Sequence, residues 1–316
     1  MTIAELAAPA LQAVGPAHGG LREGQSLWLS WQLEPQVLIP VALAALFYYR
    51  GLRPWEGRTR RHSPWRVASY YAGLAVLLLA VQSPLDVAAE HHFTFHMLQH
   101  ELLMMFAVPL ILLGAPTTPV LRGMPRWLRI DVVRPLAGER VVRRLYRLVT
   151  HPLVAVSALT VTLWAWHLMP GWYDAALRDD LVHGVQHASF AFVAVLFWWN
   201  VIDPAPLHAR MSYPLRMVFL LVGSTPKHFL AAFITFSGEA WYRAYAEMRP
   251  LVDLSLEGDQ VVGGLVMWAP SQMMHLVAIA IVFFVWAGKS EREQQARERT
   301  QLAAPNTAGD GIPTAN

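Results

Sequence analysis

Long apolar segments recur along the chain, and short polar stretches between them hold most of the charge. Each apolar segment is close to the roughly 20 residues with which an α-helix crosses the hydrocarbon core of a bilayer. Seven such segments are predicted to be transmembrane helices: Leu33–Leu52, Trp65–Gln82, Phe93–Gly114, His151–Met169, Leu181–Ile202, Tyr213–Phe236 and Val261–Ala287. Because these segments are continuously apolar, rather than alternating over about 10 residues, they favour helices over a barrel. The predicted fold is an all-α polytopic membrane protein of about seven transmembrane helices.

The apolar segments divide the chain into three parts. Residues 1–32 are predicted to be an outer N-terminal segment, residues 33–288 the membrane domain, and residues 289–316 a polar cytoplasmic tail that is expected to be disordered. The first membrane segment has the weakest pattern, because Glu34, Pro35 and Gln36 lie at its start. The N-terminus has no Lys or Arg before its apolar stretch, which is not the pattern of a cleavable signal peptide.

Basic residues are distributed unevenly between the two predicted sides of the membrane. Twenty of the 25 Lys and Arg residues lie in or beside the loops after the first, third and fifth segments, or in the tail. The opposite side holds only Arg22, Arg178, Arg243 and Arg249, and Lys227 lies inside a segment. The positive-inside rule therefore predicts an outer N-terminus and a cytoplasmic C-terminus.

One polar loop carries a further pattern. Between Glu139 and Val149, five apolar residues fall on one helical face and the arginines fall on the other. This pattern predicts a short amphipathic helix lying in the membrane interface. A solvated loop is the alternative interpretation.

The composition agrees with a membrane protein and limits the possible chemistry. Hydrophobic residues make up 55% of the chain and charged residues 15%, whereas soluble domains have about 25% charged residues. The net charge of +3 does not indicate a nucleic-acid partner, because the basic residues lie in short loops between apolar segments. The chain has no cysteine, which excludes disulfides and thiolate metal sites, so a metal ion would need His, Met, carboxylate or backbone ligands.

Histidines gather near the predicted outer face. His96 and His100, in the third segment, have the pattern HMLQH, and His183 and His187, in the fifth, have the pattern HGVQH. Residues at i and i+4 share one face of a helix, and both segments run inward from the outer side. We therefore expect two facing pairs of imidazoles, which are the commonest metal ligands in proteins.

Three other residues extend this candidate metal site. His167 and His228 are predicted at similar depth, and Met104 lies within about a quarter-turn of the His96 and His100 face by the 3.6-residue helical period. A thioether beside imidazoles suits copper better than magnesium or calcium. The predicted cofactor is therefore copper.

Two charged residues lie inside apolar segments. Glu101 follows His100, and Lys227 precedes His228. A charge inside a membrane needs a partner, so we expect Glu101 and Lys227 to pair, in either a structural or a proton-handling role. Pro226 is expected to interrupt its helix and free carbonyl groups at the same level.

Several of these segments resemble a known family, the multi-spanning CtaG-like cytochrome c oxidase assembly factors associated with caa-type oxidases. The similar pieces cover about half of the chain: HMLQHELLMMFAVPLILLGAP at 96–116, WHLMPGWYDAAL at 166–177, HGVQHASFAFVAVLFWW at 183–199, TFSGEAWYRAY at 235–245 and DQVVGGLVMWAP at 259–270. The resemblance implies a non-enzymatic, multi-pass protein of the bacterial cytoplasmic (inner) membrane. It also implies oxidase subunits as partners and a role in maturing the copper centres of the oxidase.

Two other functions remain open from the residues alone. Histidines on facing helices can ligate a haem iron from both sides, which would make the chain an electron-transfer protein. Alternatively, Glu101 and Lys227 could serve a transporter. A retinal protein is not favoured, because the intramembrane Lys227 lies in the sixth segment and not in the last.

Overall fold

The described part of the chain is helical. The computed structural model describes residues 26–53, 62–204, 206 and 211–303, and these residues form helices and loops without a strand. The expected fold class is therefore confirmed. The N-terminal segment examined for a signal peptide, His18, His208 and the end of the tail lie outside the described residues.

Six helical elements in the described residues are long and apolar enough to cross a membrane. Five of them are single helices: α2 (Pro35–Leu52), α4 (Pro64–Gln82), α13 (Asp180–Ile202), α14 (Tyr213–Thr235) and α15 (Leu256–Ala303). The sixth is composite, because α6 (Phe93–Glu101), a π-helical segment η2 (Leu102–Ala107) and α7 (Val108–Leu113) follow one another without a gap. A seventh candidate arises if α10 (Arg140–Val149) and α11 (Pro152–Leu168), bent by 67°, count together. The prediction of about seven spans agrees with this result.

Proline sets the starts of many of these helices. Pro35, Pro64, Pro84 and Pro152 occupy the first turn of α2, α4, α5 (Pro84–His91) and α11. The proline ring fixes φ near the helical value. Backbone N–H groups in the first turn have no acceptor within the helix, so the N–H that proline lacks is not missed there. Pro226 lies inside α14, which runs unbroken from Tyr213 to Thr235. The expected interruption is therefore wrong, because the helix tolerates this proline, and the Pro226 carbonyl accepts a hydrogen bond from Trp164 Nε1 at 3.1 Å.

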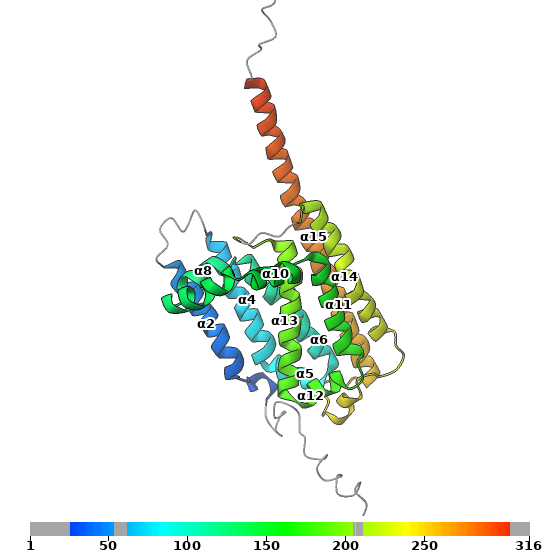
Figure 1. Cartoon of the computed structure of the whole chain (residues 1–316). Helices are drawn as coiled ribbons and strands as arrows, with labels where there is room; N and C mark the ends of the chain where they lie inside the picture. Colours follow the sequence, from blue (N-terminus) through cyan, green and yellow to red (C-terminus); the bar gives the residue numbers. More distant parts are fainter. Residues whose placement is uncertain (1–25, 54–61, 205, 207–210, 304–316) are drawn as a thin grey trace, which may run out of the picture.

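The arginine-rich segment between α7 and α11 is also helical. It contains α8 (Thr117–Gly123), the π-helical η3 (Leu128–Val133), α9 (Arg134–Gly138) and α10. Of the two interpretations of residues 139–149, the structure supports the helix. Figure 1 shows α8 and α10 at one end of the helix bundle, and α5 and α12 (Trp172–Arg178) at the opposite end. The histidine pairs lie in α6 and α13, which directly follow α5 and α12. The arginines of this segment and the histidine pairs are therefore concentrated at opposite ends of the bundle.

The main core surrounds α6, α13, α14 and α15. Gly263 and Gly264 allow α15 to approach its neighbours closely, since a Cβ at Gly263 would lie 2.3 Å from the Phe93 ring and a Cβ at Gly264 would lie 2.3 Å from Thr235 Oγ1. Small residues commonly let membrane helices pack in this way. At the same contact, the Asp259 carboxylate accepts hydrogen bonds from the backbone N–H groups of Phe93, at 2.7 Å, and Thr94, at 3.1 Å. Asp259, from a distant part of the chain, thus supplies hydrogen-bond acceptors for two backbone N–H groups of the first turn of α6, which have no acceptor within the helix.

The tail differs from its expected disorder. α15 continues past the apolar segment to Ala303 and projects beyond the bundle in Figure 1. Its outer part is rich in strong helix formers, and Lys289 lies 4.0 Å from Glu293, one turn away. These local preferences extend the helix without tertiary packing, so the expectation fails for residues 289–303.

Candidate metal centre

α6 and α13 bring four histidines together, and we call His96, His100, His183 and His187 the histidine quartet. Within each helix the ring centroids are 4.4 Å apart for His96 and His100 and 4.1 Å apart for His183 and His187. Between the helices, His96 lies 5.2 Å from His183, and His100 lies 5.2 Å from His187. The two patterns therefore face each other across the helix contact, as the i, i+4 spacing indicates.

Three members of the quartet meet the geometric requirement for a shared ion. One nitrogen from each of His96, His100 and His187 lies within 4.8 Å of the other two. His96 Nε2 and both ring nitrogens of His100 are buried without a hydrogen-bond partner. Leaving buried polar atoms unsatisfied costs about 1–3 kcal/mol each, and such atoms call for a specific explanation. A metal ion bound by His96 Nε2 and one His100 nitrogen would account for two of these atoms, while the other His100 nitrogen carries the ring proton.

A tyrosine orients His96. Tyr245, in the 3₁₀ turn η4 (Arg243–Glu247), places its hydroxyl 3.1 Å from His96 Nδ1, 3.0 Å from the Tyr173 hydroxyl and 3.3 Å from the Ala89 carbonyl. Burial raises the pKa values of Tyr173 and Tyr245 well above the ordinary tyrosine value, so both hydroxyls stay protonated. This contact directs His96 Nε2 toward the quartet, as outer hydrogen bonds orient many metal-binding histidines.

His167 lies next to the quartet. Its ring centroid is 6.4 Å from that of His100, and its Nδ1 hydrogen bonds to the Leu163 carbonyl at 2.7 Å. Because Nδ1 must carry the proton to donate to a carbonyl, Nε2 is the lone-pair nitrogen, and it is buried without a partner. His167 therefore provides a fifth imidazole at the edge of the quartet.

The glutamines of the two HxxQH patterns are fully buried but lie in different surroundings. Gln99 donates to the Ala80 carbonyl at 2.9 Å and also hydrogen bonds to Asp86, which joins α6 to α4 and α5. Gln186, from α13, is completely shielded from solvent. The spacing of the histidines does not reveal that Gln99 joins α6 to α4 and α5, or that Tyr245 contacts His96.

His91 and His92 hold the loop between α14 and α15. His92 Nε2 accepts backbone hydrogen bonds from Leu251 at 2.8 Å and Val252 at 3.2 Å, and His91 Nδ1 donates to the Arg249 carbonyl at 2.8 Å. Burial lowers the pKa of His91 below the ordinary histidine value, so its ring is neutral at pH 7. These two histidines therefore attach the Tyr245 loop to α5 and are not part of the quartet.

The predicted pairing of the intramembrane charges is present. Lys227 Nζ donates to Glu101 Oε1, and both side chains are almost fully buried. His228, next to Lys227, does not join the quartet. Its ring lies 5.8 Å from that of His275, which is stacked on Trp198. The structure thus separates His228 from the other candidate ligands.

Met104 follows His96 and His100 through a π-helical turn. It lies in η2, where the π-helical turn is wider than the 3.6-residue period that placed it a quarter-turn away. Its carbonyl accepts a hydrogen bond from Trp198 Nε1 at 3.0 Å, and its side chain belongs to the main core. A π-turn beside candidate ligands is a common feature of functional sites, and Met104 stays a predicted ligand.

Comparison with known proteins adds independent information. The family model described as cytochrome c oxidase caa3 assembly factor matches residues 46–289, which include the quartet, His167 and the Glu101–Lys227 pair. Uncharacterized proteins of Mycobacterium bovis and Mycobacterium tuberculosis are each 26% identical over 275 residues, which is 85% of this chain and 41% of each relative. A Mycobacterium leprae protein is 24% identical over 240 residues, 74% of this chain and 36% of its own length. The chain thus spans less than half the length of these relatives, and no solved structure matches it.

Proposed function

Because the chain belongs to the cytochrome c oxidase caa3 assembly factor family, we propose that it assists copper insertion into the oxidase by binding the ion at the histidine quartet. The supporting observation is the convergence of buried imidazole nitrogens on α6 and α13, with His96 Nε2 and both ring nitrogens of His100 lacking a hydrogen-bond partner. The protein acts as a carrier in this proposal, not as an enzyme, and copper is its cargo.

The donor set favours copper over other cargo ions. Imidazole binds copper in both oxidation states as well as zinc, iron and nickel, and among divalent ions a given nitrogen site holds copper most tightly. The chain lacks the cysteines that many copper carriers use, so imidazoles must provide the affinity. A carrier must also release its ion, and a few neutral nitrogens bind less tightly than a closed set of thiolates.

A haem fits these residues less well. Two opposed imidazoles would need a flat macrocycle between them, but the facing rings of α6 and α13 lie 5.2–6.1 Å apart. The Phe190 ring lies 4.7 Å from the His100 ring and occupies space beside it that a macrocycle would need. The transporter alternative loses support as well, because Glu101 and Lys227 neutralise each other.

Deleting the gene should leave oxidase subunits synthesised but poor in copper, and added copper should partly restore oxidase activity. The reason is that the carrier raises the local supply of an ion that the subunits can also take up slowly. Oxidase activity and metal content of membranes, with and without added copper, measure this effect. A fully metallated, active oxidase in the deletion strain would reject the assembly role, and a Soret band in the purified chain would favour haem.

We propose that the arginine-rich end faces the cytoplasm and the quartet end faces outside. The charge distribution along the chain supports this orientation, which would give the quartet access to copper outside the cytoplasm. A reporter fused after Asn316 should therefore behave as cytoplasmic. A signal from the outer side would reverse the orientation and place the quartet at the cytoplasmic face.

A further inference from the structure

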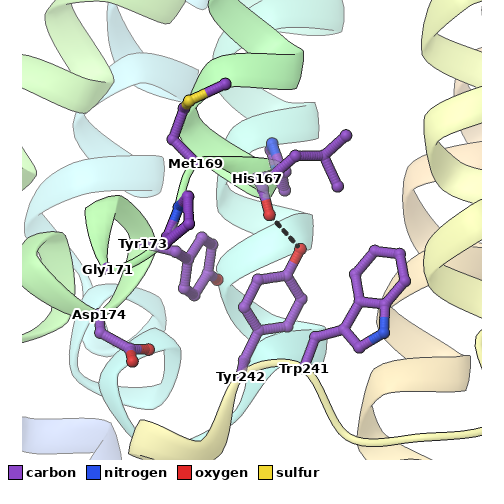
Figure 2. A pocket seen from close by; sticks show the side chains of 9 residues that line it. His167, Met169, Gly171, Tyr173, Asp174, Trp241 and Tyr242 are labelled. Carbon is purple, nitrogen blue, oxygen red and sulfur yellow. Dashed lines mark hydrogen bonds between the residues drawn. The ribbon is translucent and has the colours of Figure 1, made fainter.

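A pocket of 290 Å³ lies beside the quartet, where α11 ends and α12 begins. Figure 2 shows Met169 and Asp174 on different sides of this pocket, with the Tyr173 and Tyr242 rings between them. Its lining residues come from residues 167–174 and from Trp241 and Tyr242, just before η4. The pocket therefore sits where two loops meet at the quartet end of the bundle.

The pocket contains two side chains that can bind a metal ion. Met169 is half exposed, although methionine more often packs in a core. Its thioether is a soft ligand that suits Cu(I). The Asp174 carboxylate adds a negative charge that attracts cations. A soft sulfur and a carboxylate in one open pocket fit the brief capture of a cuprous ion.

His167 connects this pocket to the quartet. It is one of the lining residues, it is 5% exposed, and its buried Nε2 lacks a partner. Its ring lies 6.4 Å from that of His100. The Tyr242 hydroxyl holds the backbone at this point, donating to the His167 carbonyl at 3.4 Å, as Figure 2 shows. An ion that leaves the pocket through His167 therefore reaches the quartet in one further step.

A second cavity reaches the quartet from another side. It has a volume of 690 Å³, lies against α2, α4 and α13, and includes His183 and His187 in its lining. Its other lining residues are mainly aliphatic, with carboxylates from Glu34, Asp86 and Asp180 and no methionine. This cavity lacks the soft ligand of the first pocket, and its long apolar walls are poor ligands for an ion.

We propose that the smaller pocket is the entry site for Cu(I), with the Asp174 carboxylate attracting the ion at one side, Met169 binding it at the other and His167 passing it to His100. This inference rests on the proposed copper-carrying function. The ion exchanges ligands along the route without a change of oxidation state. The pocket residues determine how fast copper arrives, while the quartet determines how much is held at equilibrium.

The test compares loading rate with final occupancy in the purified full-length chain. Cu(I) held by the chromophoric chelator bicinchoninate is mixed with metal-free protein, and the transfer is followed by absorbance. The double substitution Met169→Leu and Asp174→Asn should slow loading about tenfold, at the lower end of the roughly 10–1,000-fold effect of local charge on association rates. The final copper content should equal that of the parent.

Asp180→Asn, in the larger cavity, is the matched control and should load at the parental rate. Slow loading by this control but not by the pocket variant would place entry in the larger cavity and overturn the inference. Equal slowing by both would indicate a general charge effect, which also overturns it. If the parent takes up no copper, the proposed function fails and the inference fails with it, whereas normal uptake with unchanged rates in the pocket variant rejects the inference alone.

Discussion

Replacing His100 with alanine should lower the copper affinity of the purified chain by about 100-fold or more. Second-sphere partners already contribute about 10–100-fold to metal affinity, and His100 is proposed to be a direct ligand. Both ring nitrogens of His100 are buried without a hydrogen-bond partner. His100 is also one of the three histidines, with His96 and His187, whose nitrogens lie close enough to share one ion. The affinity is measured by competition with a chelator of known strength.

His228→Ala is the matched control for this substitution. His228 is also a histidine of a membrane helix, but it contacts His275 and not the quartet. We therefore expect the His228 variant to bind copper like the parent. Equal losses in the two variants would show that the ligand set extends beyond the quartet, and parental binding by the His100 variant would reject the quartet as the copper site. Thermal unfolding in detergent without copper checks that both variants remain folded.

Lys227→Met should destabilise the chain by about 3–5 kcal/mol, because it leaves the Glu101 carboxylate buried without its cation. Lys227 and Glu101 are only 2% and 4% exposed, so water cannot replace the lost partner. The double variant Lys227→Met with Glu101→Gln should recover most of this stability, since it removes both charges. Unfolding in detergent at matched pH measures the free energy of each variant.

The same variants separate a structural pair from a functional one. If the double variant folds, binds copper and supports oxidase assembly, then the pair serves the stability of the fold. A double variant that folds and binds copper, yet does not restore oxidase assembly, would show that assembly requires the two charges. Full stability of Lys227→Met alone would contradict the destabilisation predicted here.

The sequence predicts the helices and the quartet because both depend on local periodicity. A continuous apolar segment has few alternatives to a helix in lipid, and an i, i+4 spacing places His96 and His100 on one face wherever α6 packs. The match in direction between α6 and α13 follows from the alternation of the segments across the membrane. These features need no knowledge of tertiary contacts.

Other features depend on contacts that no local pattern contains. Tyr245 reaches His96 across 149 residues of sequence, and His91 and His92 bind a loop that spacing alone cannot place beside them. The π-turn of η2, which changes the helical phase at Met104, is likewise not visible in the spacing. The helical tail shows the opposite error, since its helix propensity and ion pairs outweigh the polarity that favoured disorder.

The contact between Asp259 and the start of α6 determines when the site can form during synthesis. The N–H groups of Phe93 and Thr94 receive their acceptors from the first turn of α15, and Tyr245 lies in η4, the element just before α15. A nascent chain that has left the ribosome only as far as α14 already contains all four quartet histidines, but it lacks the groups that fix the first of them. The quartet can therefore be fully positioned only after the first turn of the last membrane helix has been made, and we expect the proposed copper binding to follow that step.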